Sequence, residues 1–389
     1  MSKQSLLLVS ESYWPNLDGG AIFEHGLAHA LKSLGWRVYV WAPSPTGIPY
    51  VEDDNGVTTI RESSRTLRSN PRYRVSRFPI FRAQHIFQLT NPDVIHIHNF
   101  GPLGVLAQKY ARMHRVPVIA TNHNVAENWT SNFFRRRIAL AEAMVAAYLA
   151  YMLNRVNIVV SPTTTADRIL AAWGVATKRL VISNGVDTQF FQPPCQAATP
   201  VDHLRLVHVG RLDREKTCQV LIRAAAQASH ARSLTLTVVG DGVERPRLER
   251  LAWDLERTAQ AAAGFVRFLG HVSEVEKLRT LQSSDLFVTA SQVELQGIAV
   301  LESMACGVPV LAPDAGALPE LCRTGYTGIL FEPGNVKDCA MKLATIEQSL
   351  LQQLGQAACS FVRAQHDVRK THDSYARLLS DVASKRGRL

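Results

Sequence analysis

The strongest constraint on the fold comes from residues 286–312, which read LFVTASQVELQGIAVLESMACGVPVLA. The apolar run at 286–289 is typical of a short buried strand, and a second apolar run at 308–312 ends the stretch. Between them lie a carboxylate, Glu294, a glycine, Gly297, and a helical pattern. The order strand, tight loop, helix and strand predicts one unit of a parallel α/β sheet, with the loop at the helix N-terminus.

That helix N-terminus is predicted to bind an anion, because its first backbone N–H groups have no partner within the helix. Gly297 has no Cβ and lets the backbone approach a ligand, and the amides of Ile298 and Ala299 would face it. Glu302 lies one turn beyond Ile298 and leans back toward the helix start. Either acid alone is more often a solvated surface residue. Together, Glu294 and Glu302 are predicted to flank a phosphate-sized pocket, where ribose and sugar hydroxyls would donate to them.

The length of 389 residues predicts two domains, because single cores stop growing near 250–300 residues. Strand and helix patterns alternate through both halves, which predicts two Rossmann-like, doubly wound parallel sheets. The predicted domains are residues 1–190 and 191–365, followed by a C-terminal helix at about 366–389.

Several features predict a cytoplasmic protein. The start, MSKQSLLLVSES, reads as a first strand and becomes polar too early for a signal peptide. No apolar run approaches the length that spans a bilayer. The six cysteines show no CxxC spacing, which is typical of reduced thiols.

Positive charge is concentrated in the first half. Residues 1–195 carry 20 Lys and Arg against 12 Asp and Glu, a net charge of +8, which leaves +2 for the remainder. Residues 61–82 interleave seven arginines with aromatic residues and break the strand–helix alternation, as a surface excursion would. This composition favours an anionic membrane surface, with nucleic acid as the rival partner. The arginines predicted to form a membrane or acceptor surface are Arg65, Arg68, Arg72, Arg74, Arg77, Arg135, Arg136 and Arg137.

Two further positions in the first half are candidates for a site. Gly19 and Gly20 precede the first helical pattern, where free N–H groups would suit a phosphate. His123 follows a strand at 118–121 and lies among amide side chains, so it is a candidate sugar contact. His96 and His98 are expected to point to opposite faces of their strand, and no metal site is predicted.

In the second half, Gly210 ends a strand at 206–209, and Arg211 and Lys216 follow it. Two cations between a strand end and a helix start suit a diphosphate. Gly270 and His271 follow another strand and are candidate contacts to a base.

These residues together resemble the retaining nucleotide-sugar glycosyltransferases of the two-Rossmann-domain (GT-B) architecture, of the glycosyltransferase family 4 kind. The resemblance covers nearly the whole chain. Its most specific parts are the Val-Gly-Arg at 209–211 with Lys216, the Glu294 and Glu302 pair with Gly297, and the Gly-Val-Pro-Val at 307–310. The Asn-Gly-Val-Asp at 184–187 and the glycine pair at 19–20 also match.

The resemblance implies a donor site in the C-terminal domain, an acceptor site in the N-terminal one and a central cleft between them. It also implies that the final helix returns to the N-terminal domain. Arg211 and Lys216 would stabilise the departing diphosphate, Glu302 would bind the ribose, and Glu294 and His123 would contact the transferred sugar. No Asp-x-Asp occurs in the chain, so the nucleotide-sugar is expected to react as a co-substrate without a metal or other cofactor.

The segment 121–128, the glutamine of ELQG and the basic segment at 61–82 resemble features of those members of the family that glycosylate membrane lipids such as diacylglycerol or phosphatidylinositol. The favoured function is therefore a hexosyltransferase that uses a UDP- or GDP-sugar and a lipid acceptor, peripheral on the inner face of a membrane. A soluble saccharide or metabolite acceptor is the alternative, followed by a nucleotide-sugar epimerase. A nucleic-acid partner is not expected, because a polyanion binder has no use for paired acids in its site.

Overall fold

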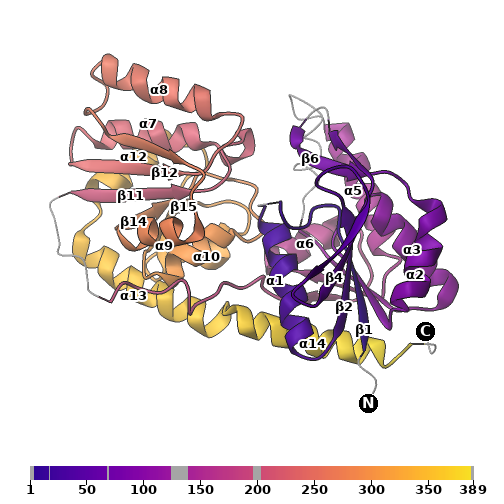
Figure 1. Cartoon of the computed structure of the whole chain (residues 1–389). Coiled ribbons are helices and arrows are strands. Elements are labelled where there is room, and N and C mark those ends of the chain that lie inside the picture. The colour runs from indigo at the N-terminus through magenta and orange to yellow at the C-terminus, as the bar shows by residue number, and fades with distance from the viewer. Residues whose placement is uncertain (1–3, 17, 68–69, 124–138, 196–202, 387–389) are drawn as a thin grey trace. The chain divides into compact units, whose positions relative to one another are not determined.

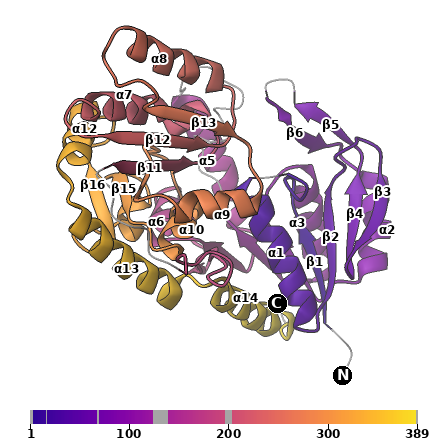
Figure 2. The same cartoon turned by 60° about the vertical axis from the view of Figure 1, so that its left-hand side comes forward.

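The computed structural model describes residues 4–16, 18–67, 70–123, 139–195 and 203–386. The chain forms two compact units, of which the first holds Met1–Ser183 with Thr371–Leu389 and the second holds Asn184–Lys370. Each unit has its own sheet between layers of helices (Figures 1 and 2). None of the helices in the described ranges is long and apolar enough to cross a membrane.

The first unit is built on an eight-stranded sheet. All its strand pairs are parallel except that of β3 with β4, which forms an antiparallel edge. In spatial order the strands are β10 (Arg179–Val181), β9 (Ile158–Ser161), β8 (Val118–Thr121), β7 (Val94–Ile97), β1 (Ser5–Val9), β2 (Arg37–Pro43), β4 (Val57–Glu62) and β3 (Tyr50–Asp54). Without β3, the order is that of a doubly wound sheet.

Helices cover both faces of this sheet, and the alternation of side chains along β1 explains how. Leu6 and Leu8 pack with α1 (Gly19–Ser33) and α14 (Val368–Ala383), whereas Leu7 and Val9 pack with the helices of the other face. Those helices are α2 (Ile80–Thr90), α3 (Pro102–His114), α5 (Ala139–Leu153) and α6 (Thr164–Ala172). Tyr375 of α14 is fully buried in the first unit, with its hydroxyl 3.0 Å from Thr121 Oγ1.

The arginine-rich segment at 61–82 is more ordered than its sequence predicted. It contains the end of β4, a two-stranded hairpin of β5 (Ser64–Leu67) and β6 (Asn70–Ser76), and the start of α2. Arg61, the first arginine of this segment and not one of those predicted to form the basic surface, points inward from β4. It is 3% exposed, and its guanidinium donates to Glu52 Oε1 (2.8 Å) and to the Trp14 carbonyl oxygen (2.5 Å).

The second unit is built on a six-stranded, fully parallel sheet. In spatial order the strands are β13 (Val266–Gly270), β12 (Leu234–Val239), β11 (Leu204–Val209), β14 (Leu286–Val288), β15 (Val310–Pro313) and β16 (Gly328–Phe331). The sequence pattern did not predict β16. This order, 3-2-1-4-5-6, is the doubly wound Rossmann order.

The helices of the second unit also form two layers. Those that pack against Leu206 and Leu236 are α7 (Cys218–Ala228), α8 (Arg245–Arg257) and α12 (Val336–Thr345). Those that pack against Val207 and Val239 are α9 (Glu274–Gln282), α10 (Ile298–Ala305), α11 (Leu318–Leu321) and α13 (Gln348–Gln365). The pattern at 336–354 predicted one helical stretch, but the backbone is extended at Ile346 (ψ 128°) and separates α12 from α13.

In both units the strand order reverses at one place, between β1 and β7 and between β11 and β14. Ligands of doubly wound sheets bind where the carboxyl ends of the strands meet such a reversal. The sequence-predicted residues lie at these two places: Gly210, Arg211 and Glu294 in the loops after β11 and β14, and Gly19 and Gly20 at the start of α1, the helix that follows β1.

Candidate active site

The loops after β11, β12 and β13 in the second unit pack against one another as a single edge. The Gly240 N–H donates to the Gly270 carbonyl oxygen at 2.7 Å. Gly240 has a φ of +125°, and a Cβ there would lie 2.0 Å from the Gly210 carbonyl oxygen, so only glycine fits. This close approach fixes the loop that carries Arg211 and Lys216.

An ion pair between Lys216 and Glu294 lies at the carboxyl ends of the strands. Lys216 ends the single turn η1 (Arg214–Lys216), and its Nζ contacts Glu294 Oε1; the two side chains are 18% and 19% exposed. Burial would raise the pKa of Glu294, but the Lys216 ammonium, with a smaller effect from Arg211, holds that pKa below its usual value. Glu294 is therefore a charged carboxylate at neutral pH.

Arg211 turns toward acids of its own loop. Its guanidinium contacts Asp213 Oδ2 and donates to Glu215 Oε1 at 2.9 Å. The two cations, Arg211 and Lys216, are thus each matched by a nearby carboxylate. An anion that binds here would compete with those carboxylates for the same N–H groups.

Glu302 lies on α10 and is 7% exposed, with a partner that the sequence did not indicate. Lys277 of α9 donates to Glu302 Oε1 at 2.8 Å and lies 2.9 Å from Glu274. Burial raises the pKa of Glu302 to about 6, although the Lys277 ammonium opposes the rise. The two acids that were predicted to flank one pocket are each occupied by a separate lysine. Lys277 belongs to no motif, and only the three-dimensional packing brings it to Glu302.

The start of α10 has the backbone geometry that the sequence predicted. Gly297 is its N-cap, with a φ of +83°, and as a glycine it offers no side chain to cap this helix end. The amides of Ile298 and Ala299 follow in the first turn. The preceding residue, Gln296, is 3% exposed, and its Oε1 accepts the Asn184 backbone N–H at 3.0 Å. Gln296 therefore anchors the loop before the helix.

Gly270 and His271 lie at the end of β13. Gly270 has a φ of +73°, and the Arg245 guanidinium lies 2.7 Å from where a Cβ would be. His271 is exposed. Their contact with a base stays a prediction.

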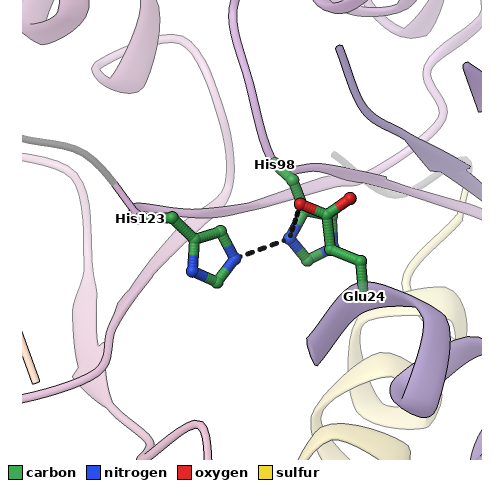
Figure 3. Close-up of side chains that lie close together, drawn as sticks. All are labelled: Glu24, His98 and His123. Carbon is green, nitrogen blue, oxygen red and sulfur yellow. Dashed lines mark hydrogen bonds and ion pairs between the residues drawn. The ribbon is translucent and has the colours of Figure 1, made fainter. Parts of the chain in front are cut away.

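In the first unit, Glu24, His98 and His123 form a cluster at the carboxyl ends of β7 and β8 (Figure 3), in which Glu24 and His98 are buried and His123 is half-buried. The ring nitrogens His98 Nδ1 and His123 Nε2 are 2.9 Å apart, and Glu24 Oε1 lies 3.6 Å from His98 Nδ1. Burial raises the pKa of Glu24 well above its usual value and lowers the pKa of His123 to about 4. Burial thus favours the uncharged forms of the Glu24 carboxyl and of the His123 imidazole. The 2.9 Å contact with His98 Nδ1 fixes the orientation of the His123 ring.

The expectation that His96 and His98 point to opposite faces is wrong. Residues two apart on a strand share a face, and the two rings are 4.0 Å apart between centroids. If both side chains had been assigned to one face of the strand, the sequence would have indicated His98 as a further candidate residue of the site. Glu24 was also missed; it lies on the first predicted helix, four residues beyond Gly20.

Gly19 is the first residue of α1, with Asp18 as its N-cap. Asp18 Oδ1 accepts the Ala21 N–H at 3.0 Å, so a carboxylate already binds the amides at this helix end. The start of α10 differs, because its N-cap is a glycine. A Cβ on Gly20 would lie 3.8 Å from both Glu24 Oε1 and His123 Cγ. Gly20 therefore forms one wall of the cluster.

The predicted basic surface is only partly described. Arg65 and Arg77 are exposed. Arg74 instead holds the β5–β6 hairpin, because its guanidinium donates to Ser64 Oγ and Thr66 Oγ1, both at 2.9 Å. The side chains that lie outside the described residues are those of Arg68, Arg72, Arg135, Arg136 and Arg137.

Two family profiles match successive parts of the chain. Glycosyltransferase Family 4 matches residues 17–190, and Glycosyl transferases group 1 matches residues 196–359. These parts contain all three residues of the Glu24 cluster and both lysine–glutamate pairs, respectively.

Similar proteins include one that is named for sulfoquinovosyl transfer and two that are named for the synthesis of a glucosyldiacylglycerol. Sulfoquinovosyl transferase SQD2 of Arabidopsis thaliana is 28% identical over 69% of this chain and 52% of its own length, so the match spans about half of the plant enzyme. Alpha-monoglucosyldiacylglycerol synthase of Streptococcus pneumoniae is 26% identical over 83% of this chain and 74% of its own. The enzyme of that name from Acholeplasma laidlawii is 23% identical, over 83% and 84%.

Similar solved structures share the fold over nearly the whole chain. Sucrose-phosphate synthase from Thermosynechococcus elongatus has a TM-score of 0.81 at 21% identity, covering 98% of this chain and 100% of that one. Anabaena HepE in complex with UDP-glucose has a TM-score of 0.74 at 19% identity, covering 97% and 99%. With its two doubly wound sheets and both family matches, the chain belongs to the GT-B glycosyltransferases, with a Family 4 domain followed by a group 1 domain.

Proposed function

We propose that this glycosyltransferase moves a hexose from a UDP- or GDP-sugar to a membrane lipid, with retention of the anomeric configuration. The observation that carries the donor part is the Lys216–Glu294 pair at the strand-order reversal of the group 1 domain. The pair offers one cation for a diphosphate and one charged carboxylate for sugar hydroxyls.

The ion pairs of the second unit suggest how the donor would bind. The diphosphate would take Lys216 and Arg211 from their carboxylate partners, with the amides at the uncapped start of α10 adding to the anion site. Glu294, released from Lys216, would accept hydrogen bonds from the transferred sugar. Glu302 would accept from the ribose hydroxyls, with Lys277 holding its carboxylate in place.

In the proposed reaction, the acceptor hydroxyl oxygen bonds to the anomeric carbon as the bond from that carbon to the diphosphate oxygen breaks. Both events take place on the same face of the sugar, and the hydroxyl proton passes to the departing diphosphate. Arg211 and Lys216 stabilise the negative charge that develops there, the task that a metal ion performs in other enzymes. His123, which His98 orients, contacts the sugar.

A lipid acceptor is proposed from two observations. The similar proteins include two named as glucosyldiacylglycerol synthases. The start of α2 also exposes large apolar side chains next to arginines: Phe78, Ile80 and Phe81 are 60%, 62% and 98% exposed, and Arg77 is exposed beside them. Aromatic and basic side chains of this kind suit the headgroup level of an anionic bilayer, where the contact would be peripheral.

Replacing Phe78 and Phe81 together by Ser should weaken binding to anionic vesicles by roughly tenfold or more, because both rings would lose their apolar environment in the bilayer. Co-sedimentation with vesicles that contain phosphatidylglycerol measures the effect. Trp253→Ser is the matched control, since Trp253 is 60% exposed on α8 of the other unit. Equal sedimentation of the double variant, the control and the unchanged protein would contradict the membrane proposal.

A soluble acceptor remains the second candidate, because D-inositol 3-phosphate glycosyltransferase 1 of Catenulispora acidiphila is also 28% identical, over 62% of this chain. A lipid acceptor would be supported if the double variant transfers sugar to lipid in vesicles more slowly than the unchanged protein but hydrolyses the donor at the same rate. Transfer to a soluble acceptor at the same rate in both proteins would favour the second candidate.

A further inference from the structure

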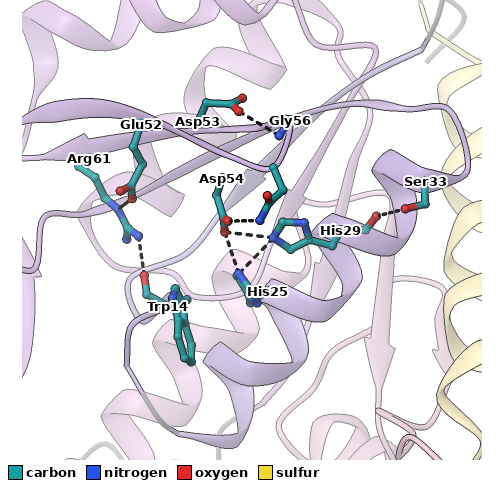
Figure 4. Close-up of polar contacts among 10 residues, drawn as sticks. Trp14, His25, His29, Ser33, Glu52, Asp53, Asp54, Gly56 and Arg61 are labelled. Carbon is teal, nitrogen blue, oxygen red and sulfur yellow. Dashed lines mark hydrogen bonds and ion pairs between the residues drawn. The ribbon is translucent and has the colours of Figure 1, made fainter. Parts of the chain in front are cut away.

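A second cluster in the first unit has no place in the proposed reaction. His25 and His29 lie one turn apart on α1, and Asp54 ends β3, the edge strand of the sheet. The three side chains point toward one another (Figure 4). Their exposed fractions are 28%, 25% and 30%, so solvent reaches the cluster.

The potential ligand atoms form a compact triangle. His25 Nε2 and His29 Nε2 lie 2.8 and 3.0 Å from the same oxygen, Asp54 Oδ2, and 3.1 Å from each other. A cation about 2.1 Å from all three atoms would lie about 1.2 Å out of their plane. Edges near 3.0 Å match three neighbouring positions of an octahedron at that bond length, the arrangement of a two-histidine, one-carboxylate site.

Hydrogen bonds among these three atoms cannot satisfy all of them at once. Each Nε2 carries at most one proton and can direct it to only one neighbour. If both His25 and His29 donate to Asp54, two N–H groups face each other at 3.1 Å. If one ring donates to the other, neither nitrogen has a proton left to donate to the carboxylate. A single divalent cation accepts a lone pair from all three atoms at once.

Neighbouring residues hold the ligands in these orientations. The Asn55 side chain donates to the other carboxylate oxygen, Asp54 Oδ1, at 3.1 Å. The Trp14 ring stacks on the His25 ring, with centroids 5.2 Å apart and an interplanar angle of 29°. Contacts of this second layer commonly orient the ligands of a metal site and raise its affinity.

From this geometry we propose that His25, His29 and Asp54 bind a divalent first-row transition-metal ion, with the remaining coordination positions open to water. Imidazole and carboxylate ligands suit Zn²⁺, Ni²⁺ and Co²⁺. The ion would clamp the middle of α1 to the β3 edge of the sheet. It would not take part in sugar transfer, but α1 also carries Gly20 and Glu24, so the clamp would steady one side of the Glu24 cluster.

Metal binding is tested with full-length protein that carries no histidine tag. Isothermal titration with NiCl₂ and with ZnCl₂ should show one equivalent in the unchanged protein. His29→Gln and Asp54→Asn should each weaken that binding at least tenfold, because each removes one ligand. His85→Gln is the matched control, an exposed histidine on a helix outside the cluster.

Trp14 provides a second readout, because bound Ni²⁺ or Cu²⁺ quenches the fluorescence of an adjacent indole. Saturating Ni²⁺ should quench part of the emission of the unchanged protein, and Trp14→Phe should remove that part while one equivalent still binds. Absence of a saturable equivalent in the unchanged protein would overturn the proposal without any variant. An equivalent that both ligand variants keep would also overturn it, and one that only His123→Gln loses would assign the ion to the Glu24 cluster instead.

Discussion

Glu294→Gln should lower kcat for sugar transfer by roughly a hundredfold to a thousandfold, the usual effect of removing one preorganised electrostatic contact in an active site. The amide keeps the size of the side chain but loses the charge that strengthens the hydrogen bonds from the sugar hydroxyls. It also leaves Lys216 without its carboxylate partner in the free enzyme. Binding of the nucleoside diphosphate should therefore stay the same or become tighter, because no carboxylate competes for Lys216.

Steady-state transfer rates and titration with UDP and GDP separate these two effects. Asp285→Asn is the matched control, because Asp285 pairs with Arg205 (2.7 Å) at the opposite, amino-terminal end of β14. It should lose stability without loss of kcat. A Glu294→Gln enzyme with kcat within threefold of the unchanged protein would contradict the assignment of Glu294.

Lys216→Met should have an effect of similar size on kcat, because it removes a cation from the departing diphosphate. In contrast to Glu294→Gln, it should also weaken nucleoside diphosphate binding. The pH dependence should change as well. Lys216 holds the pKa of Glu294 below its usual value against the effect of burial, so the pKa of Glu294 should rise in the variant.

Since Glu294 acts as a carboxylate, activity is lost as pH falls through its pKa, and a raised pKa moves this loss to higher pH. The acid limb of the kcat/KM profile should therefore shift upward in Lys216→Met. Lys342→Met is the control, because Lys342 pairs with Asp338 of its own helix, α12, and not with a predicted site residue. An unshifted acid limb together with unchanged diphosphate binding would exclude the proposed role of Lys216.

Much of the fold could be predicted from sequence because its signals are local. Apolar runs and glycines near strand ends predicted most of the parallel strands and the loops that carry Arg211 and Glu294. The strands β3 and β4, the hairpin of β5 and β6 and the edge strand β16 were not predicted. All but β16 are rich in polar residues, and short strands of that composition lack a distinctive pattern. The inward direction of Arg61 was also missed, since the arginine run at 61–82 hides the alternation of β4.

The residues of the candidate site also fall into those that a local sequence pattern predicts and those that only the folded chain brings together. Glu294, Gly297 and Lys216 belong to local motifs and were predicted. Lys277, whose partner Glu302 is 25 positions away, and Glu24 have no local signal, because only packing between elements brings them to their partners. The triangle of His25, His29 and Asp54 likewise depends on the antiparallel return of β3 beside α1, which no spacing rule contains.

The most direct test of the proposed function is product identification after incubation with a panel of UDP- and GDP-hexoses and a panel of lipid and soluble acceptors. Nuclear magnetic resonance of the purified product gives the anomeric configuration of the new bond. The expected product is a glycolipid whose hexose keeps the configuration it had in the donor. An inverted linkage, or donor hydrolysis without transfer to any acceptor, would contradict it.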